Sequence, residues 1–193
     1  MNNKKNIIYN FKNFWNFLQK DTWQSLIVFF IIAIIFIKFI LFPFLSLITG
    51  SALPLVIVES CSMYHQENGL ENTLQKSIYT KNGITLENSK NWDFKNGLNK
   101  GDVIFVMKST NLKQGDVIIF NGGANHPIIH RLIDDTEPYA TYGDNNMGQL
   151  EKERKIEEDQ LMGKAIFKIP YIGWIKLIFF EHLRPNDQKG LCK

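Results

Sequence analysis

The most pronounced feature of the chain is a continuous apolar run near its N-terminus. Residues Leu26 to Phe42 carry one charge, Lys38, and the run continues past Pro43 to Ile48. A helix rises about 1.5 Å per residue, so a hydrocarbon core of about 30 Å takes about 20 residues to cross. The pattern predicts a transmembrane anchor over residues 23–48, in which Lys38 extends its amine toward the interface.

Two other interpretations of this run exist. A buried core helix is disfavoured because the run is apolar on every side and long. A cleavable signal peptide is the better rival, since the small residues Gly50, Ser51 and Ala52 follow the run. Its basic leader and its apolar region would both be longer than usual, so we favour an uncleaved anchor.

Residues 1–22 form a leader in which apolar and polar positions alternate with helical spacing. This pattern predicts an amphipathic helix lying in the membrane interface, with a frayed polar tail as the alternative. Lysines are frequent before the span, whereas no Lys or Arg stands between Lys38 and Lys76. The positive-inside rule then places the leader in the cytoplasm and everything after residue 50 on the other side. The apolar positions of the leader are Ile7, Phe11, Phe14, Trp15 and Leu18.

Beyond residue 52 the pattern changes to short β-like runs separated by turn residues. Closely spaced strands with little helix predict a mainly β, all-β domain over residues 53–183. Within it, the polar stretch 64–97 is interpreted as an excursion, either a hairpin or a flexible loop, and 151–161 as a polar helix. Residues 184–193 form a polar tail. The expected strands include Leu55–Val58, Pro127–Ile133, Tyr139–Tyr142 and Met162–Phe167.

A near-repeat suggests two further strands. Leu98–Ile104 is echoed by Leu112–Ile118, fourteen positions later. In each copy a Gly-Asp pair is typical of a turn that leads into a β-branched strand. We interpret the copies as two hairpin-linked strands, with Asp102 and Asp116 binding their own backbone at the turns.

The stretch Ile169–Leu183 is apolar but contains Pro170, Lys176 and Glu181. It is too short and too charged for a second span. Tyr and Trp are enriched at the level of lipid headgroups, so an interfacial segment is the better interpretation.

Composition and charge exclude some classes of function. The net charge is +3, and only three of the 22 basic residues are arginine, which argues against a nucleic-acid surface. The two cysteines, Cys61 and Cys192, are 131 positions apart and indicate neither a disulfide scaffold nor a zinc site. We expect Cys61 to be buried and inert, and we expect no metal or cofactor.

Two residues carry candidate chemistry. A serine hydroxyl becomes a good nucleophile only when a positioned base removes its proton and donors stabilise the oxyanion. Ser62 lies just past the predicted strand Leu55–Val58, and His130 lies in an apolar strand about seventy residues further on. Spacing alone does not establish this pair, because single serines and histidines are common.

The surrounding motifs resemble type I signal peptidases. Their order, with an apolar anchor directly upstream, covers about residues 20 to 180. The motifs are Ser60-Cys61-Ser62-Met63, Gly101-Asp102-Val103, Gly115-Asp116-Val117-Ile118, Ile129-His130-Arg131-Leu132-Ile133, Gly143-Asp144-Asn145-Asn146, and Gly163-Lys164 followed by Pro170-Tyr171-Ile172-Gly173. Histidine rather than lysine before Arg131 places the resemblance with the serine–histidine branch, found in archaea and the endoplasmic reticulum.

The resemblance implies a membrane-bound serine endopeptidase that removes signal peptides from exported preproteins. Ser62 would be the nucleophile, His130 the base, and Ser60 would help to bind the oxyanion. The implied location is the cell membrane, or the endoplasmic-reticulum membrane, with the catalytic domain outside the cytoplasm. The implied partners are preproteins, the bilayer and the protein translocon, with no nucleic acid.

The sequence departs from this family at the acid that orients the histidine. The branch normally has an aspartate six positions after the one that matches Asp144, and that position is Leu150 here. We expect Asp144 to replace it, with Glu151 as the second candidate and a serine–histidine dyad as the third possibility. Met63 is also followed by Tyr64-His65-Gln66, where the family usually has an acidic or small residue and proline.

Other functions stay open at this stage. His65 is an alternative base, although a neighbour three residues from the serine rarely has the right geometry. His126 and His182 are interpreted as surface residues. The chain could be a catalytically degenerate homologue that serves a membrane complex as a non-enzymatic β-domain. It could also be a peptidase of another purpose, such as a self-cleaving or pilus-processing relative.

Overall fold

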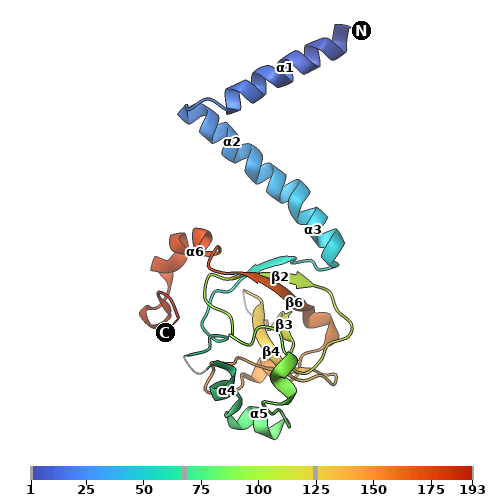
Figure 1. The fold of residues 1–193 in the computed structure, drawn as a ribbon, viewed down its shortest axis with the longest axis vertical. Helices are drawn as coiled ribbons and strands as arrows, with labels where there is room; N and C mark the ends of the chain where they lie inside the picture. Colours follow the sequence, from blue (N-terminus) through green and yellow to red (C-terminus); the bar gives the residue numbers. More distant parts are fainter. Residues whose placement is uncertain (1, 67–68, 124–125, 193) are drawn as a thin grey trace. The chain divides into compact units, whose positions relative to one another are not determined.

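The computed structural model describes residues 2–66, 69–123 and 126–192, and the chain divides into two compact units, Met1–Ile48 and Thr49–Lys193. The first residue of the predicted leader, two residues of the excursion and the last residue of the predicted tail lie outside the described residues. Figure 1 shows both units as ribbons coloured along the sequence.

The N-terminal unit is helical. Helix α1, Asn2–Leu18, corresponds to the leader, and its location in the membrane interface stays a prediction. A second run of helix from Trp23 to Thr49 is long and apolar enough to cross a membrane, and it combines α2, Trp23–Phe36, a π-helical turn, Ile37–Leu41, and α3, Phe42–Thr49. Thr22 caps this run, since its Oγ1 accepts a hydrogen bond from the Ser25 amide at 3.4 Å. Most of the apolar side chains in the run are exposed, which suits a helix surrounded by lipid.

The second unit is built on one antiparallel sheet of six strands in the order β1-β2-β6-β3-β4-β5 (Figure 1). This confirms the predicted mainly β architecture with an N-terminal apolar helix. The strands are β1, Leu55–Ile57; β2, Val103–Met107; β3, Val117–Phe120; β4, Ile128–Asp134; β5, Ala140–Tyr142; and β6, Leu161–Ile169.

The expectation that the near-repeat forms two hairpin-linked strands is wrong. Strand β6 lies between β2 and β3 and pairs with both. Its lysines also neutralise the repeated Gly-Asp turns, because Lys168 lies 3.3 Å from Asp102 and Lys164 lies 2.7 Å from Asp116. Strand β6, which comes late in the chain, therefore lies between the two strands that were expected to pair directly with each other.

The Gly-Asp turns themselves have the predicted form. The Asp102 carboxylate accepts a hydrogen bond from the Asn99 amide at 2.9 Å, and the Asp116 carboxylate accepts one from the Lys113 amide at 3.0 Å. Each preceding glycine has a positive φ, and a Cβ on it would collide with a tryptophan ring. The ring is Trp174 at Gly101 and Trp92 at Gly115. The repeat therefore encodes two similar tryptophan-covered turns rather than a hairpin.

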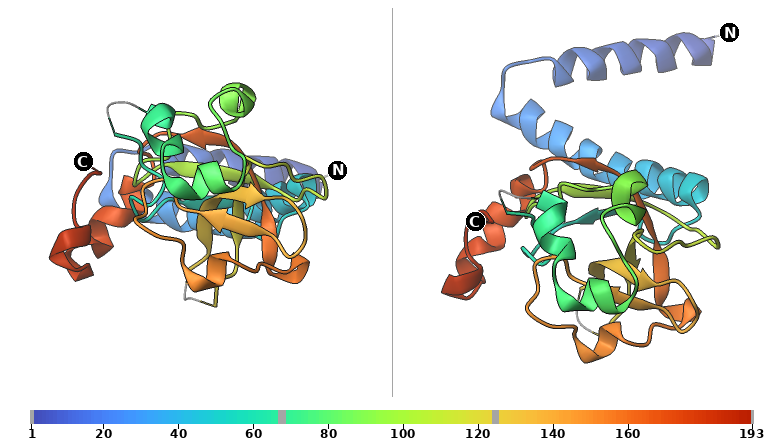
Figure 2. Two further views of the ribbon diagram at one scale, coloured as in Figure 1. Left: turned by 90° about the horizontal axis from the view of Figure 1, so that it is seen from below. Right: turned by 60° about the horizontal axis from the view of Figure 1, so that its bottom comes forward.

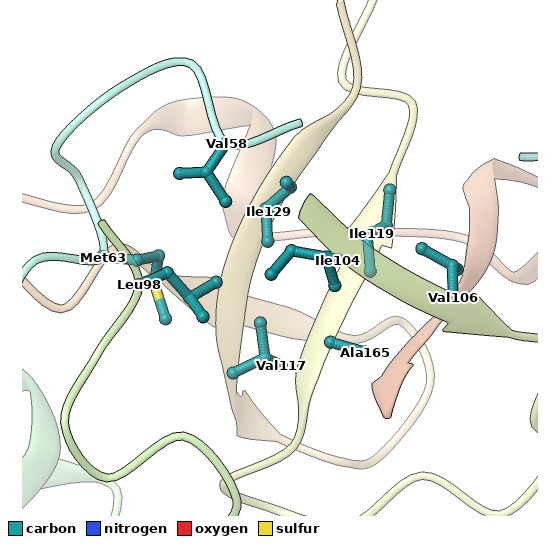
Figure 3. Close-up of a cluster of buried hydrophobic side chains, with 9 residues drawn as sticks. All are labelled: Val58, Met63, Leu98, Ile104, Val106, Val117, Ile119, Ile129 and Ala165. Carbon is teal, nitrogen blue, oxygen red and sulfur yellow. The ribbon is translucent and has the colours of Figure 1, made fainter. Parts of the chain in front are cut away.

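The main apolar core is formed by side chains of β2, β3, β4 and β6 that pack against one another and against three residues of the adjoining loops (Figure 3). Met63 and Leu98 are almost fully buried beside residues from β2, β3, β4 and β6. Because Met63 is buried in this core, its packing fixes the position of the neighbouring loop that carries Ser62. The nine buried side chains are Val58, Met63, Leu98, Ile104, Val106, Val117, Ile119, Ile129 and Ala165.

The stretch 64–97 is neither a hairpin nor an unstructured loop. It contains two short helices, α4, Gly69–Leu74, and α5, Ser77–Lys81, and a 3₁₀ turn, Asn88–Asn91. Its apolar side chains pack against Ile133 of β4 and Tyr142 of β5, so the helices cover that end of the sheet (Figure 2). Likewise, the predicted polar helix at 151–161 consists of two separate 3₁₀ turns, Glu151–Glu153 and Glu158–Gln160.

After β6 the chain continues into helix α6, Trp174–Phe180, and two 3₁₀ turns, Glu181–Leu183 and Asn186–Gln188. Cys192 forms a disulfide bond with Cys61, and their Cα atoms are 5.5 Å apart. The expectation of a buried and inert Cys61 is wrong. Both cysteines are half-buried, and the fold brings them together across 131 positions, a pairing that spacing alone does not reveal.

A buried ion pair joins β4 to the turn after β5. The Arg131 guanidinium donates to both carboxylate oxygens of Asp144 at 2.7–3.1 Å, and both side chains are buried. Arg131 also donates to the backbone carbonyls of Asp93, Phe94 and Gly115. One guanidinium therefore connects the sheet, the second Gly-Asp turn and the end of the excursion.

The electrostatics of this pair follow from its burial. Burial by itself raises the pKa of the Asp144 carboxyl, but the Arg131 charge and the hydrogen bonds from His65 and Arg131 hold that pKa well below its usual range. Burial and the Asp144 charge raise the pKa of the Tyr79 phenol, which therefore stays protonated and donates to Asp144 at 2.5 Å. The carboxylate has enough donors to remain ionised inside the protein.

We expect Gly115→Ala to destabilise the domain by about 1–3 kcal/mol, because the new methyl group would lie 2.1 Å from the Trp92 ring at a backbone φ of +97°. Urea unfolding measures the change. Gly148→Ala is the matched control, since a methyl group at that position would meet open space and the backbone φ there is not positive. Equal stability of the two variants would show that Trp92 does not cover the turn.

We expect Asp144→Asn to destabilise the domain by about 3–5 kcal/mol, because it leaves the buried Arg131 charge without its partner. A carboxyl whose pKa is depressed on folding stabilises above its unfolded pKa of about 3.9 and loses that contribution as the pH falls below it. The variant should therefore lose less stability than the wild type between about pH 4 and pH 2. The exposed Asp187→Asn is the control, and a similar small effect from both substitutions would contradict the assignment.

Candidate active site

The structure brings Ser62 and His130 together. Ser62 lies in the loop that follows β1, and His130 lies on β4, where it pairs with Ile118 of β3. The Ser62 Oγ is 2.9 Å from the His130 Nε2, which is hydrogen-bond distance. Ser62 is half-buried and the His130 side chain is buried, so the pair lies at the surface of the core with one side accessible.

A third residue, which the sequence analysis did not identify, completes this arrangement. The Glu153 Oε1 contacts the Nδ1 of His130, and Glu153 is fully buried. Its second oxygen accepts a hydrogen bond from the Leu150 amide at 2.6 Å. A carboxylate on Nδ1 keeps the proton on that nitrogen, so Nε2 presents its lone pair to the Ser62 hydroxyl.

Neither acid expected from the sequence contacts His130 in the described structure. The carboxylate of Asp144 is bound by Arg131, His65 and Tyr79 instead. Glu151 is exposed, because the 3₁₀ turn that begins there directs its first two side chains to solvent and the third, Glu153, inward. The carboxylate that contacts His130 thus stands three positions after Leu150. The sequence feature that could have indicated it was a glutamate at the end of a short turn.

The turn Gly143–Asn146 holds Ser62 and His130 in register. A Cβ at Gly143 would lie 2.8 Å from the His130 Nε2, so glycine leaves room for the ring. Asn145 binds the Ser62 loop with its amide to the Ser62 carbonyl at 2.7 Å and its side chain to the Cys61 carbonyl at 3.1 Å. Asp144, which stands between Gly143 and Asn145, fixes the turn to Arg131. Its role in this structure is therefore to position the turn.

The Ser60 Oγ is 3.1 Å from the Ser62 Oγ. If the Ser62 hydroxyl donates to His130, the hydroxyl that donates to the Ser62 Oγ is that of Ser60. This places a second hydroxyl beside the atom that would attack, on an exposed residue that a substrate can reach.

The ring of His65 contacts other partners than Ser62. Its Nε2 is 2.7 Å from the Asp144 carboxylate, and its Nδ1 is 2.7 Å from the Lys95 carbonyl. Both ring nitrogens therefore face acceptors other than Ser62.

The arrangement has the groups that nucleophilic acyl transfer requires. It contains a hydroxyl, an imidazole that accepts its proton, a buried carboxylate that orients the imidazole, and a neighbouring hydroxyl donor. Among the residues that the structure describes, no group of three or more His, Cys, Asp or Glu side chains could hold a metal ion.

Comparison with known proteins identifies relatives of this chain. No protein-family model matches it. It is 28% identical over 97 residues to the signal peptidase complex catalytic subunit sec11 of Sclerotinia sclerotiorum, a match covering 43% of this chain and 56% of the relative. It is 25% identical over 174 residues to the subunit of the same name from Scheffersomyces stipitis, covering 83% of this chain and 86% of that one. The match to the first of these thus spans little more than half of the relative.

These homologues support signal peptidase function at the level of the family. The longer match includes most of the segment in which the motifs lie. The chain is a homologue of signal peptidase complex catalytic subunits, which confirms its resemblance to type I signal peptidases of the endoplasmic-reticulum branch.

Proposed function

We propose that this chain is a membrane-bound serine endopeptidase that removes signal peptides from preproteins, with Ser62, His130 and Glu153 as its catalytic triad. The observation that carries the proposal is the continuous chain of contacts from the Ser62 hydroxyl through His130 to the buried Glu153. Homology to signal peptidase catalytic subunits supports the substrate class.

The reaction follows from the positions of the atoms. Ser62 attacks the scissile carbonyl while the Nε2 of His130 takes its proton, and the imidazolium then donates that proton to the leaving amine. Glu153 stabilises the imidazolium and holds the ring in the required tautomer. Water later attacks the acyl-enzyme with the same base, which releases the signal peptide and frees Ser62.

The oxyanion requires donors that are in place before the reaction. Ser60 supplies one, because its hydroxyl is already 3.1 Å from the attacking oxygen. The backbone amide of Ser62 is the second donor in this proposal. Once the Ser62 oxygen has become bonded to carbon, the Ser60 hydroxyl is free to turn toward the negative charge on the former carbonyl oxygen.

The substrate approaches along the edge of the sheet in this proposal. Strand β1 is an edge strand, and it ends at Ile57, five residues before Ser62. An extended peptide that pairs with a strand edge presents alternate side chains to the protein, which favours small residues before the cut. In the sequence, the anchor ends at Ile48, fourteen residues before Ser62.

The disulfide bond supports the proposed orientation. Disulfides persist in oxidising compartments and are rare in the cytosol. Cys61 and Cys192 both belong to the second unit, so a bond between them is consistent with a domain outside the cytoplasm. This agrees with the orientation that the distribution of lysines predicts.

Ser62→Ala should reduce preprotein cleavage by at least about 10³-fold without unfolding the domain, because it removes the nucleophile and leaves the packing unchanged. The measurement is cleavage of a preprotein by the purified full chain in detergent. Cleavage by this variant at near the wild-type rate would refute the mechanism. A wild-type chain that folds but never cleaves would instead favour a degenerate homologue.

Glu153→Gln should lower kcat by up to about 10⁴-fold, because an amide cannot stabilise the imidazolium and can favour the wrong tautomer. Glu151→Gln is the matched control, two residues away on the same turn and exposed, and it should change kcat less than about two-fold. The opposite ranking would assign the orienting role to Glu151. If both substitutions had small effects, the enzyme would be a Ser62–His130 dyad.

A further inference from the structure

Successive side chains of the loop that carries Ser62 alternate between two groups of partners. In Glu59-Ser60-Cys61-Ser62, the two serine hydroxyls lie 3.1 Å apart beside His130. The other two residues bind a distant part of the chain, residues 171–192, called here the α6 segment. Cys61 is bonded to Cys192, and Glu59 lies 2.8 Å from Arg184 and 3.4 Å from Lys176.

The α6 segment is itself firmly attached to the start of β2. The Gly173 amide donates to the Gly101 carbonyl at 2.8 Å, and the Trp174 indole donates to the Lys100 carbonyl at 3.0 Å. The Lys100 side chain is buried beneath the segment. Its amine pairs with Glu181 and donates to the Gln188 carbonyl at 2.7 Å. A segment held at several points offers the loop a fixed support.

The loop needs such support because it lies outside the strands. Strand β1 ends at Ile57, and the Val58 amide makes the last sheet-like contact with the Asp102 carbonyl. Beyond it, Asn145 binds the carbonyls of Cys61 and Ser62 from one side. The disulfide and the Glu59 ion pairs hold the loop through its side chains.

We propose that the Cys61–Cys192 disulfide and the Glu59–Arg184 ion pair are positioning contacts that hold Ser60 and Ser62 against His130. The inference rests on the proposed function. A displacement of about 1 Å of a reacting group can cost about 10²-fold in rate. In this proposal the disulfide acts through the positions of the two serines, so its loss should lower kcat and leave KM unaltered. Catalysis by this chain consequently depends on the redox state of one bond, next to its nucleophile.

The redox step is an ordinary exchange with a dithiol. One thiolate of the dithiol attacks a sulfur of the Cys61–Cys192 bond, forms a mixed disulfide and displaces the other cysteine as a thiolate. The second thiol of the reagent then closes on the mixed disulfide. The protein gains two electrons and two protons as two thiols, and the reagent becomes a cyclic disulfide. Both cysteines are half-buried, so a small dithiol can reach them.

The test compares oxidised and dithiol-reduced full chain in preprotein cleavage, with circular dichroism on the same samples. We expect reduction to lower kcat about 10- to 100-fold at constant KM, with an unchanged spectrum, and reoxidation to restore the rate. The double variant Cys61→Ser/Cys192→Ser should match the reduced wild type and be insensitive to the dithiol. If that variant does not fold, the reversible change in the wild type still decides the question.

Three results would overturn the inference. The first is an unchanged kcat after complete reduction, verified by counting free thiols. The second is a loss of activity that follows unfolding of the domain, which would make the bond merely stabilising. The third is an equal effect of dithiol on the double variant. These outcomes are distinct from failure of the proposed function, in which the oxidised wild type would show no cleavage that Ser62→Ala removes.

Discussion

The buried ion pair between Arg131 and Asp144 is the contact on which the arrangement of the site depends. Successive residues of a strand point to opposite faces, so His130 and Arg131 serve two sides of β4. His130 faces Ser62, whereas Arg131 anchors the turn that contains Asp144. That turn carries Asn145, which binds the Ser62 loop. Ser62 and His130 are thus held in register by an ion pair to which neither of them belongs.

Such a pair is costly to bury, and the structure shows how the cost is offset. Two charges removed from water need excellent geometry and additional hydrogen bonds. Asp144 receives donors from His65 and Tyr79 in addition to Arg131, and Arg131 donates to three backbone carbonyls. Several of these partners belong to the 64–97 excursion. The excursion therefore completes the electrostatic support of the turn as well as covering the sheet.

The sequence predicted the parts that depend on local pattern. The apolar helix, the mainly β domain and the Gly-Asp turns all follow from residues close together in the chain. The strand order could not be predicted, because β6, which lies between β2 and β3, stands far beyond the repeat in the chain. The disulfide was missed for the same reason, since only the completed fold brings Cys61 to Cys192.

The candidate site was predicted in part. Ser62 and His130 were chosen from motifs, and the structure places them 2.9 Å apart. The acid was assigned to Asp144 because its neighbours Gly143 and Asn145 place it on a tight turn after a predicted strand, whereas Glu153 reaches His130 through a 3₁₀ turn interpreted as part of a helix. In an α-helix, position 153 would face a different direction. The 3₁₀ geometry of residues 151–153 thus determines which carboxylate contacts the imidazole of His130.

The most direct test of the account is a double-mutant cycle between His130→Ala and Glu153→Gln, read out as kcat for preprotein cleavage. Residues that act as one unit lose their effects together. The account predicts that Glu153→Gln impairs the wild type strongly and has almost no effect in the His130→Ala background. If the two losses multiplied, Glu153 would act independently of His130, and the proposed triad would be wrong.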